Sequence, residues 1–332
     1  MMPSRRFPSN LPGMILESIV YNVEIFLECE KKDIAAFADR TGPRSIKTGI
    51  TTPFAGNRIE ALEWAIYHHL LGFDHVWMYV NEPWEDGKDL PSTDFLTFIP
   101  YNNHLKDIYV GANISMTNMI AQWSEVFRAN AQNDALYRAS RMGLEWMAFP
   151  DLDELVVLVT STLSNATMSN LTATIPSSPA LQSYLTDFKL THGDTYGAIF
   201  LQSVPFGRNV QNKSKLELQI DYTWRQKLNL TASHCCTARN KLLLDMRQAP
   251  VSVSIHYYIA DRRPNMYHPT ADELRINHYK RRDEGVFNMK HKYLGPPEIL
   301  EDTRLRDEYR DRIVQQITSI REGQLSIIIH NI

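Results

Sequence analysis

The chain has little cysteine, no long apolar run and no excess of positive charge. Its three cysteines are Cys29 and the neighbours Cys235 and Cys236, which cannot form a disulfide framework. No segment approaches the roughly 20 apolar residues that cross a membrane. The 35 Lys and Arg residues stand against 38 Asp and Glu residues. This balance argues against indiscriminate binding to the phosphates of nucleic acid.

What remains is the composition of a globular protein, with 43% apolar and 22% charged residues among 332. A chain of this length buries roughly three quarters of its unfolded surface, so its core needs no disulfide or metal for stability. We expect an N-terminal extension over residues 1–45, where three prolines fall in the first dozen residues. One catalytic domain would follow over 46–295, and then a C-terminal helix and tail over 296–332.

Signals for a cellular compartment point in two directions. The chain lacks a secretory signal and a membrane segment, which favours the cytoplasm, and we expect no membrane anchor within it. Against this, five N-x-S/T sequons occur where chance would give about 2.5. They begin at Asn113, Asn165, Asn170, Asn212 and Asn229. This modest excess permits a place in the secretory lumen.

Apolar periodicity predicts alternating helices and strands. Helices are expected over 57–71, with a stop at Gly72, over 118–142 and over 296–321. Strands are expected over 75–80, 145–149, 198–201, 242–244 and 251–255, and a surface loop over 160–179. This alternation predicts an α/β fold with a parallel or mixed sheet flanked by helices. Ligands of such sheets bind beyond the carboxyl ends of the strands.

The acidic segment Asp151-Leu152-Asp153-Glu154 directly follows one of these strands. Carboxylate oxygens are the ligands that Mg²⁺ and Mn²⁺ prefer, and substrate phosphates usually complete the coordination. Because alternate residues leaving a strand point the same way, Asp151 and Asp153 could converge on one cation. The alternative is a solvated acidic turn whose carboxylates cap a helix.

The wider pattern resembles the nucleotide-sugar-dependent glycosyltransferases of the GT-A fold, in particular glycosyltransferase family 92 and its family-2-like relatives. Four blocks in the same order carry the resemblance. They are Asn57 to Asp86 with Glu63-Trp64 and Tyr67-His68, Ala131 to Glu154, Pro205-Phe206-Gly207 with Arg239-Asn240-Lys241 and Ile255-His256, and Asn277-His278-Tyr279 with Phe287 and Lys290. The chain departs from the family pattern at Val80, Ala135, Leu155 and Asp283.

The resemblance implies a GT-A-type, Rossmann-like fold and a metal-dependent hexosyltransferase. The donor would be a nucleoside diphosphate sugar, with a UDP-hexose such as UDP-galactose as the first choice, and the acceptor a glycan, with inversion at the transferred carbon. It also implies the Golgi or secretory lumen. The metal would be Mn²⁺ or Mg²⁺ held by Asp151 and Asp153, with His278 as a further ligand and His256 as the second choice. An imidazole ligand favours Mn²⁺.

Other residues have weaker assignments. Donor binding is expected to involve Asn57, Asn81, Asp86, Asp151 and Lys290, although Asn81 and Asp86 would equally serve to shape a turn. An inverting enzyme needs a carboxylate that accepts the proton of the acceptor hydroxyl. The candidates are Asp245, Asp221 and Asp194, with Asp245 slightly preferred because it ends the predicted strand over 242–244.

Two other functional classes stay open at this point. The first is a GT-A-like domain that has lost catalysis and binds a glycan or a protein. The second is a metal-dependent phosphohydrolase, which would release phosphate from simple esters without a sugar acceptor. Metal-dependent binding of UDP would separate the transferase from the inactive binding module.

Overall fold

The computed structural model describes eleven stretches of the chain, all within one compact unit, Ile46–Ile332. They are residues 47–54, 58–80, 93–100, 116–159, 180–207, 218–226, 241–248, 250–254, 257–260, 265–279 and 299–321. For residues 58, 100, 116–127, 250–254, 257–260, 299 and 321 the backbone alone is described. The predicted domain boundaries at 45 and 295 stay predictions.

The described strands form a mixed sheet. Four of them run parallel in the order β4-β1-β2-β3, from β4 (Trp146–Ala148) through β1 (Thr48–Phe54) and β2 (His75–Val80) to β3 (Leu96–Pro100). Next to β4 lies the antiparallel strand β8 (Lys241–Asp245), followed by the long strand β6 (Tyr196–Gly207). The inner strand β2 is buried along its whole length, which explains its apolar run from Val76 to Val80.

Beyond β8 the sheet continues along the whole length of β6. Strand β11 (Asn265–Tyr267) and then β12 (Leu274–Tyr279) run parallel to β6, and β5 (Glu154–Leu158) pairs antiparallel with β12. Strands β7 (Trp224–Gln226) and β13 (Ile299–Glu301) form the outer edge. A separate hairpin consists of β9 (Pro250–Ser254) and β10 (Tyr257–Ala260).

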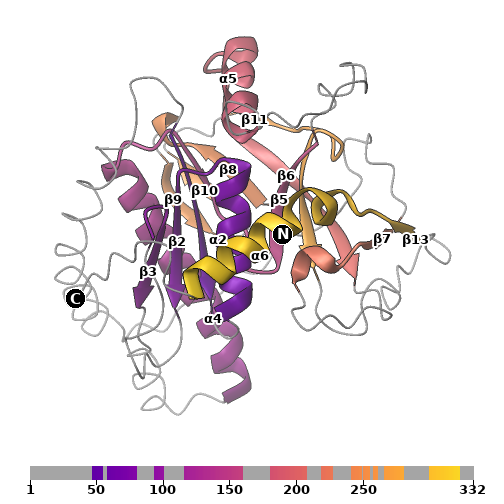
Figure 1. The fold of residues 1–332 in the computed structure, drawn as a ribbon. Helices are drawn as coiled ribbons and strands as arrows, with labels where there is room; N and C mark the ends of the chain where they lie inside the picture. Colours follow the sequence, from indigo (N-terminus) through magenta and orange to yellow (C-terminus); the bar gives the residue numbers. More distant parts are fainter. Residues whose placement is uncertain are drawn as a thin grey trace. The chain divides into compact units, whose positions relative to one another are not determined.

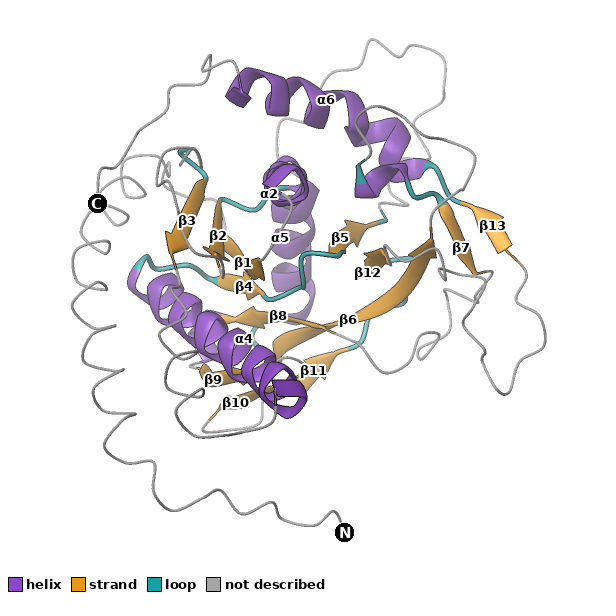
Figure 2. Ribbon diagram, turned by 90° about the horizontal axis from the view of Figure 1, so that it is seen from below, coloured by secondary structure: helices purple, strands orange, loops and turns teal. Residues whose placement is uncertain are grey.

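Helices cover both faces of the sheet (Figures 1 and 2). On one face lie α2 (Arg58–Leu71) and α6 (Arg304–Arg321), which contact each other through the edge-to-face rings of Tyr67 and Tyr309. On the other face lies α4 (Met116–Arg141), next to the β9–β10 hairpin. Helix α5 (Ala180–His192) packs Phe188 edge-on against Trp146 of β4. The predicted α/β architecture is therefore confirmed.

Several predicted elements match the structure within a few residues. The helices over 57–71 and 118–142 are α2 and α4, and Gly72 follows α2 with a φ of 124°, which favours glycine. The strands over 75–80 and 242–244 are β2 and β8. The helix expected over 296–321 begins later, at Arg304, because β13 occupies Ile299–Glu301. The 160–179 loop and all five sequons lie outside the described residues.

Side chains of α2 make hydrogen bonds to the main chain of β5, where a neighbouring strand would otherwise pair. The Tyr67 hydroxyl donates to the main-chain oxygen of Val156 (2.7 Å), and the Val156 N–H donates to Nε2 of His68 (3.1 Å). His68 is fully buried, and burial lowers its pKa to about 3, so its imidazole is neutral. Both main-chain groups of Val156 are therefore satisfied by helix side chains.

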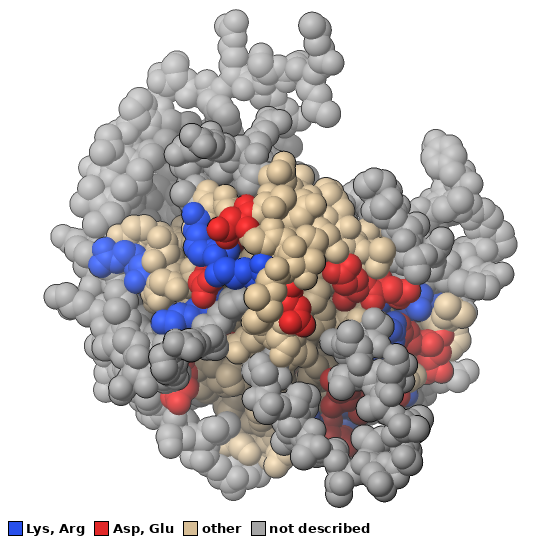
Figure 3. Space-filling view, turned by 90° about the horizontal axis from the view of Figure 1, so that it is seen from above, with Lys and Arg blue, Asp and Glu red and all other residues tan. Residues whose placement is uncertain are grey.

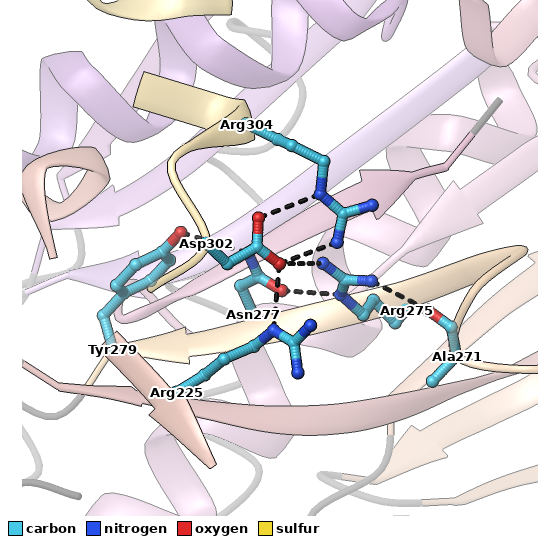
Figure 4. A network of polar contacts seen from close by, with 7 residues as sticks. All are labelled: Arg225, Ala271, Arg275, Asn277, Tyr279, Asp302 and Arg304. Atoms are coloured by element: carbon cyan, nitrogen blue, oxygen red, sulfur yellow. Dashed lines mark hydrogen bonds and ion pairs between the residues drawn. The ribbon is translucent and has the colours of Figure 1, made fainter. Parts of the chain in front are cut away.

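Helix α6 is tied to the sheet through a cluster of charges at its start (Figure 4). Asp302 accepts from Nε of Arg225 (2.9 Å) and from Nε and Nη2 of Arg304 (2.9 and 2.7 Å), and Nη2 of Arg275 lies 3.4 Å away. Burial would raise the pKa of Asp302, but these guanidinium groups hold it well below its ordinary value. Arg275 is almost completely buried and also donates to Asn277 and to the oxygen of Ala271.

Surface charges of both signs are interspersed. Figure 3 shows Lys and Arg side chains lying among Asp and Glu side chains on one face of the molecule. This agrees with the near balance of charge in the sequence. Among the described helices, none has the length and apolar character that a membrane crossing requires.

Candidate functional site at the acidic turn

The site is built around the turn Asp151–Glu154, which joins the end of β4 to the start of β5. The N–H of Asp151 donates to Oε2 of Glu154 (2.8 Å), and the N–H of Glu154 donates to the oxygen of Asp151 (3.0 Å). The N–H of Tyr279 on β12 donates to the oxygen of Asp153 (2.7 Å). The turn is thus held by its own main chain and by the neighbouring strand.

A buried lysine neutralises part of the acidic turn. Lys241, the first residue of β8, is fully buried, and its Nζ lies 2.9 Å from Oδ2 of Asp151 and 3.5 Å from Oε2 of Glu154. Because β8 runs antiparallel to β4, the first residue of β8 lies near the last residues of β4. Arg128 of α4 adds a second positive charge, with Nη1 3.6 Å from Oδ2 of Asp151.

The pKa values of the two carboxylates beside Lys241 are shifted in opposite directions. Burial would raise the pKa of Asp151, but Lys241 and Arg128 more than offset this, and the pKa lies below its ordinary value. Burial raises the pKa of Glu154 to about 7, an effect that Lys241 opposes and the nearby Asp151 reinforces. At neutral pH Asp151 is therefore an anion.

The structure brings together Asp153 and His278, two of the predicted metal ligands. Nε2 of His278 lies 3.2 Å from Oδ2 of Asp153, because β12 pairs antiparallel with β5 and places His278 opposite Glu154. The Asp153 side chain is 40% exposed and that of His278 only 6%. A carboxylate open to solvent thus lies beside a buried imidazole, on the turn that follows the carboxyl end of β4.

Helix α2 supports this turn from the side of the core. Nε1 of the buried Trp64 donates to the main-chain oxygens of Glu154 (2.8 Å) and Asp151 (3.2 Å). The neighbouring Glu63 accepts from the N–H groups of Gln219 and Ile220 (2.8 and 2.9 Å), in the short 3₁₀ helix η2 (Gln219–Asp221). Gln219 in turn donates to the oxygen of Leu152 (3.1 Å). Neighbouring residues of α2 therefore support both sides of the turn.

The three candidate bases do not gather at this site. Asp245 lies opposite Trp146 at the start of β4 and bonds Arg247, whose Nη2 is 3.4 Å from Asp194. Because β8 runs antiparallel to β4, its first residue, Lys241, lies near the acidic turn, and Asp245 lies at the opposite end of the strand. A role for Asp245 as the base stays a prediction. Asp221 caps η2 and accepts from Nε of Arg310 (2.7 Å), which ties it to α6.

Other predicted site residues lie outside the described residues. This applies to Asn57, Asn81, Asp86, His256 and Lys290. Within the part of the chain that the structure describes, no group of three or more His, Cys, Asp or Glu side chains is arranged to hold a metal ion. Asp153 and His278 thus form a pair to which substrate oxygens would have to add further ligands.

The sequence assigns no role to Lys241 or Arg128, and it assigns Trp64, with Glu63, to the core and the helix surface rather than to the site. Lys241 and Trp64 stand in the blocks that carry the family resemblance. The sequence did contain one indication that a positive residue lies near the turn: three carboxylates within four residues require a nearby cation. Which residue provides that positive charge depends on the strand order.

Comparison with known proteins gives little further information. No protein-family model matches the chain, and no curated protein matches it. Among solved structures, the chain is similar to apo UDP-glucose pyrophosphorylase, with 8% sequence identity and a TM-score of 0.22 over 82% of this chain and 99% of that one. A likeness this low carries no argument about fold or function.

Proposed function

We propose that the protein is a metal-dependent glycosyltransferase of the GT-A type. It would transfer a hexose, with galactose as first choice, from a UDP-sugar to a glycan acceptor with inversion. The observation that carries the proposal is the Asp153–His278 pair, whose Oδ2 and Nε2 atoms are 3.2 Å apart. The pair lies on the turn after the carboxyl end of β4, and ligands of α/β proteins bind beyond the carboxyl ends of strands. The five sequons support a place in the Golgi or secretory lumen.

The residues of the site suit a divalent cation. Asp153 and His278 offer one carboxylate and one imidazole, a donor set that Mn²⁺ accepts more readily than Mg²⁺. Oδ1 of Asp151 is buried and has no hydrogen-bond partner among the described residues, so it is available as a further ligand. A cation bound there would neutralise the charge that develops on the departing diphosphate.

The protein's own side chains have distinct roles in this proposal. Lys241 holds Asp151 in place and offsets its charge, so the turn forms before any donor arrives. Trp64 fixes the main chain on both sides of Asp153, and the β5–β12 pairing places His278 beside it. Such a preformed site needs little rearrangement when the donor binds. The proposal assigns no base to Asp194, Asp221 or Asp245.

The test is the Asp153→Ala variant, with Mn²⁺-dependent hydrolysis of UDP-galactose and its transfer to glycan acceptors as the readouts. We expect activity to be abolished and the melting temperature to be nearly unchanged, because the side chain is 40% exposed. The matched control is Asp194→Ala, an exposed aspartate at the other edge of the sheet. Undiminished turnover in Asp153→Ala would refute the proposal.

The alternative is an inactive GT-A-like module that binds a glycan or a protein. The Asp153–His278 pair argues against it, because a module without catalysis has no need to keep this donor set together. Calorimetry with UDP, with and without Mn²⁺, separates the two. Binding that requires Mn²⁺ supports the transferase, whereas glycan binding without any UDP binding supports the module.

A further inference from the structure

The peptide groups on both sides of Asp153 are held by hydrogen bonds from other elements. Before Asp153, the oxygen of Leu152 accepts from Nε2 of Gln219 in η2 (3.1 Å). After it, the oxygen of Asp153 itself accepts from the N–H of Tyr279 (2.7 Å). Because each peptide group is planar, these two bonds restrain both main-chain dihedral angles of Asp153. The orientation of the Asp153 carboxylate therefore depends on Gln219 as well as on β12.

The segment that carries Gln219 is held in place by two carboxylates. Glu63 of α2 accepts from the N–H groups of Gln219 and Ile220 (2.8 and 2.9 Å). Asp221, the last residue of η2, accepts through Oδ2 from the N–H of Leu218 (3.1 Å). Three successive N–H groups thus donate to carboxylate oxygens. A 3₁₀ helix of one turn has few hydrogen bonds of its own, so its position depends on such partners.

Helix α6 holds the second of these carboxylates. Oδ1 of Asp221 accepts from Nε of Arg310 (2.7 Å), and the two side chains are 21% and 30% exposed. The two oxygens of Asp221 therefore join η2 to α6. A series of hydrogen bonds runs from Arg310 through Asp221 and η2 to the main chain beside Asp153. Glu63 is completely buried, so the ion pair with Arg310 is the part of this support that is open to solvent.

We propose that Asp221 and Arg310 are positioning residues for the acidic turn. Their ion pair keeps η2 where Gln219 binds the oxygen of Leu152, and this bond keeps the Asp153 carboxylate in the orientation that binds the cation. Both residues act through the main chain and not by contact with the reacting atoms. The inference rests on the proposed function for the role of the metal, whereas the link between α6 and the turn is measurable without it.

The test measures two properties of the full chain. The first is its affinity for Mn²⁺ in the presence of UDP, by calorimetry, and the second is hydrogen exchange of the peptide that covers the acidic turn, by mass spectrometry. We expect Gln219→Leu and Arg310→Met each to weaken Mn²⁺ binding by about twofold to thirtyfold, the range for changes along a coupling network, and to speed exchange at the turn. A merely structural role would lower the melting temperature and leave the affinity of the folded protein unchanged.

Arg306→Met is the matched control for Arg310→Met. Arg306 lies on the same helix, its side chain is also 30% exposed, and it pairs with Glu301 and Asp307, which are not part of η2. This change should alter neither Mn²⁺ affinity nor exchange at the turn. Arg310→Lys is the conservative variant: it keeps a positive charge beside Asp221 and should retain most of the affinity that Arg310→Met loses.

A double variant tests whether the two residues act in series. If Arg310 acts through Gln219, the chain with both changes should bind Mn²⁺ no more weakly than Gln219→Leu alone. Additive losses would overturn the inference, as would unchanged affinity and exchange in both single variants. If the wild type binds no Mn²⁺ in the presence of UDP, the proposed function fails. Faster exchange at the turn in both single variants would then still support the link to α6.

Discussion

Nζ of Lys241 lies 2.9 Å from Oδ2 of Asp151, so the first residue of β8 supplies the counter-charge for a turn that follows β4. The lysine is completely buried, and Glu154 is its second carboxylate neighbour, at 3.5 Å. A cation belonging to the chain therefore occupies the inner side of the acidic turn. On the outer side of the turn the Asp153 side chain is 40% exposed.

The first prediction concerns this ion pair. Lys241→Met should destabilise the fold by about 3–5 kcal/mol, because it removes the buried cation between Asp151 and Glu154 and leaves only the partly exposed Arg128 beside Asp151. The measurement is urea unfolding at pH 7. Lys189→Met is the matched control, since Lys189 pairs with Glu145 at 3.3 Å with both side chains partly exposed. That change should cost about 0–1 kcal/mol. Equal effects of the two changes would contradict the assigned role.

The second prediction isolates the hydrogen bonds of the Trp64 indole. Trp64→Phe removes the N–H that donates to the main-chain oxygens of Asp151 and Glu154. It should lower the free energy of unfolding by more than the smaller ring volume alone would. Trp77→Phe is the control, because Trp77 is equally buried and its Nε1 has no partner among the described residues. We expect Trp64→Phe to exceed the control by roughly 1–3 kcal/mol in unfolding free energy. A smaller cost for Trp64 than for Trp77 would rule this out.

The third prediction follows from the buried carboxyl of Glu63. Burial raises its pKa to about 8, an effect that the N–H groups of Gln219 and Ile220 partly oppose. The folded chain therefore holds a proton on Glu63 that the unfolded chain has lost above about pH 4.5. Between these values the folded state binds more protons, so this group makes stability fall as the pH rises, by on the order of a few kcal/mol in total.

Glu63→Gln tests this dependence. The amide does not titrate, so the unfolding free energy of the variant should fall less steeply than that of the wild type between pH 5 and 8. The free energy of unfolding of the variant should also be lower. In wild type both carboxyl oxygens accept main-chain N–H groups, whereas in the variant the amide NH₂ would meet one of these N–H groups, and two donors cannot bond each other. Glu154, with a pKa of about 7, contributes to the slope of both proteins and cancels in their difference. Parallel pH curves would contradict the prediction.

Local sequence predicted much of the fold because local physics decides it. Helix α2 has apolar residues at helical spacing and a glycine after its last residue, and β2 is apolar from Val76 to Val80 because both its faces are covered. The acidic turn could likewise be located from its place after a strand. The association of His278 with Asp153 followed from the family resemblance, since nothing in the local sequence connects residues so far apart.

Only the tertiary structure decided which end of each strand lies at the site. Asp245 and Lys241 both border the same apolar run, and the sequence does not state that β8 runs antiparallel to β4. Strand direction depends on how the whole sheet pairs, which is a property of distant contacts. The sequence by itself determined the elements and the acidic turn, whereas the pairing of β8 with β4 and of β12 with β5 determined which charges meet there.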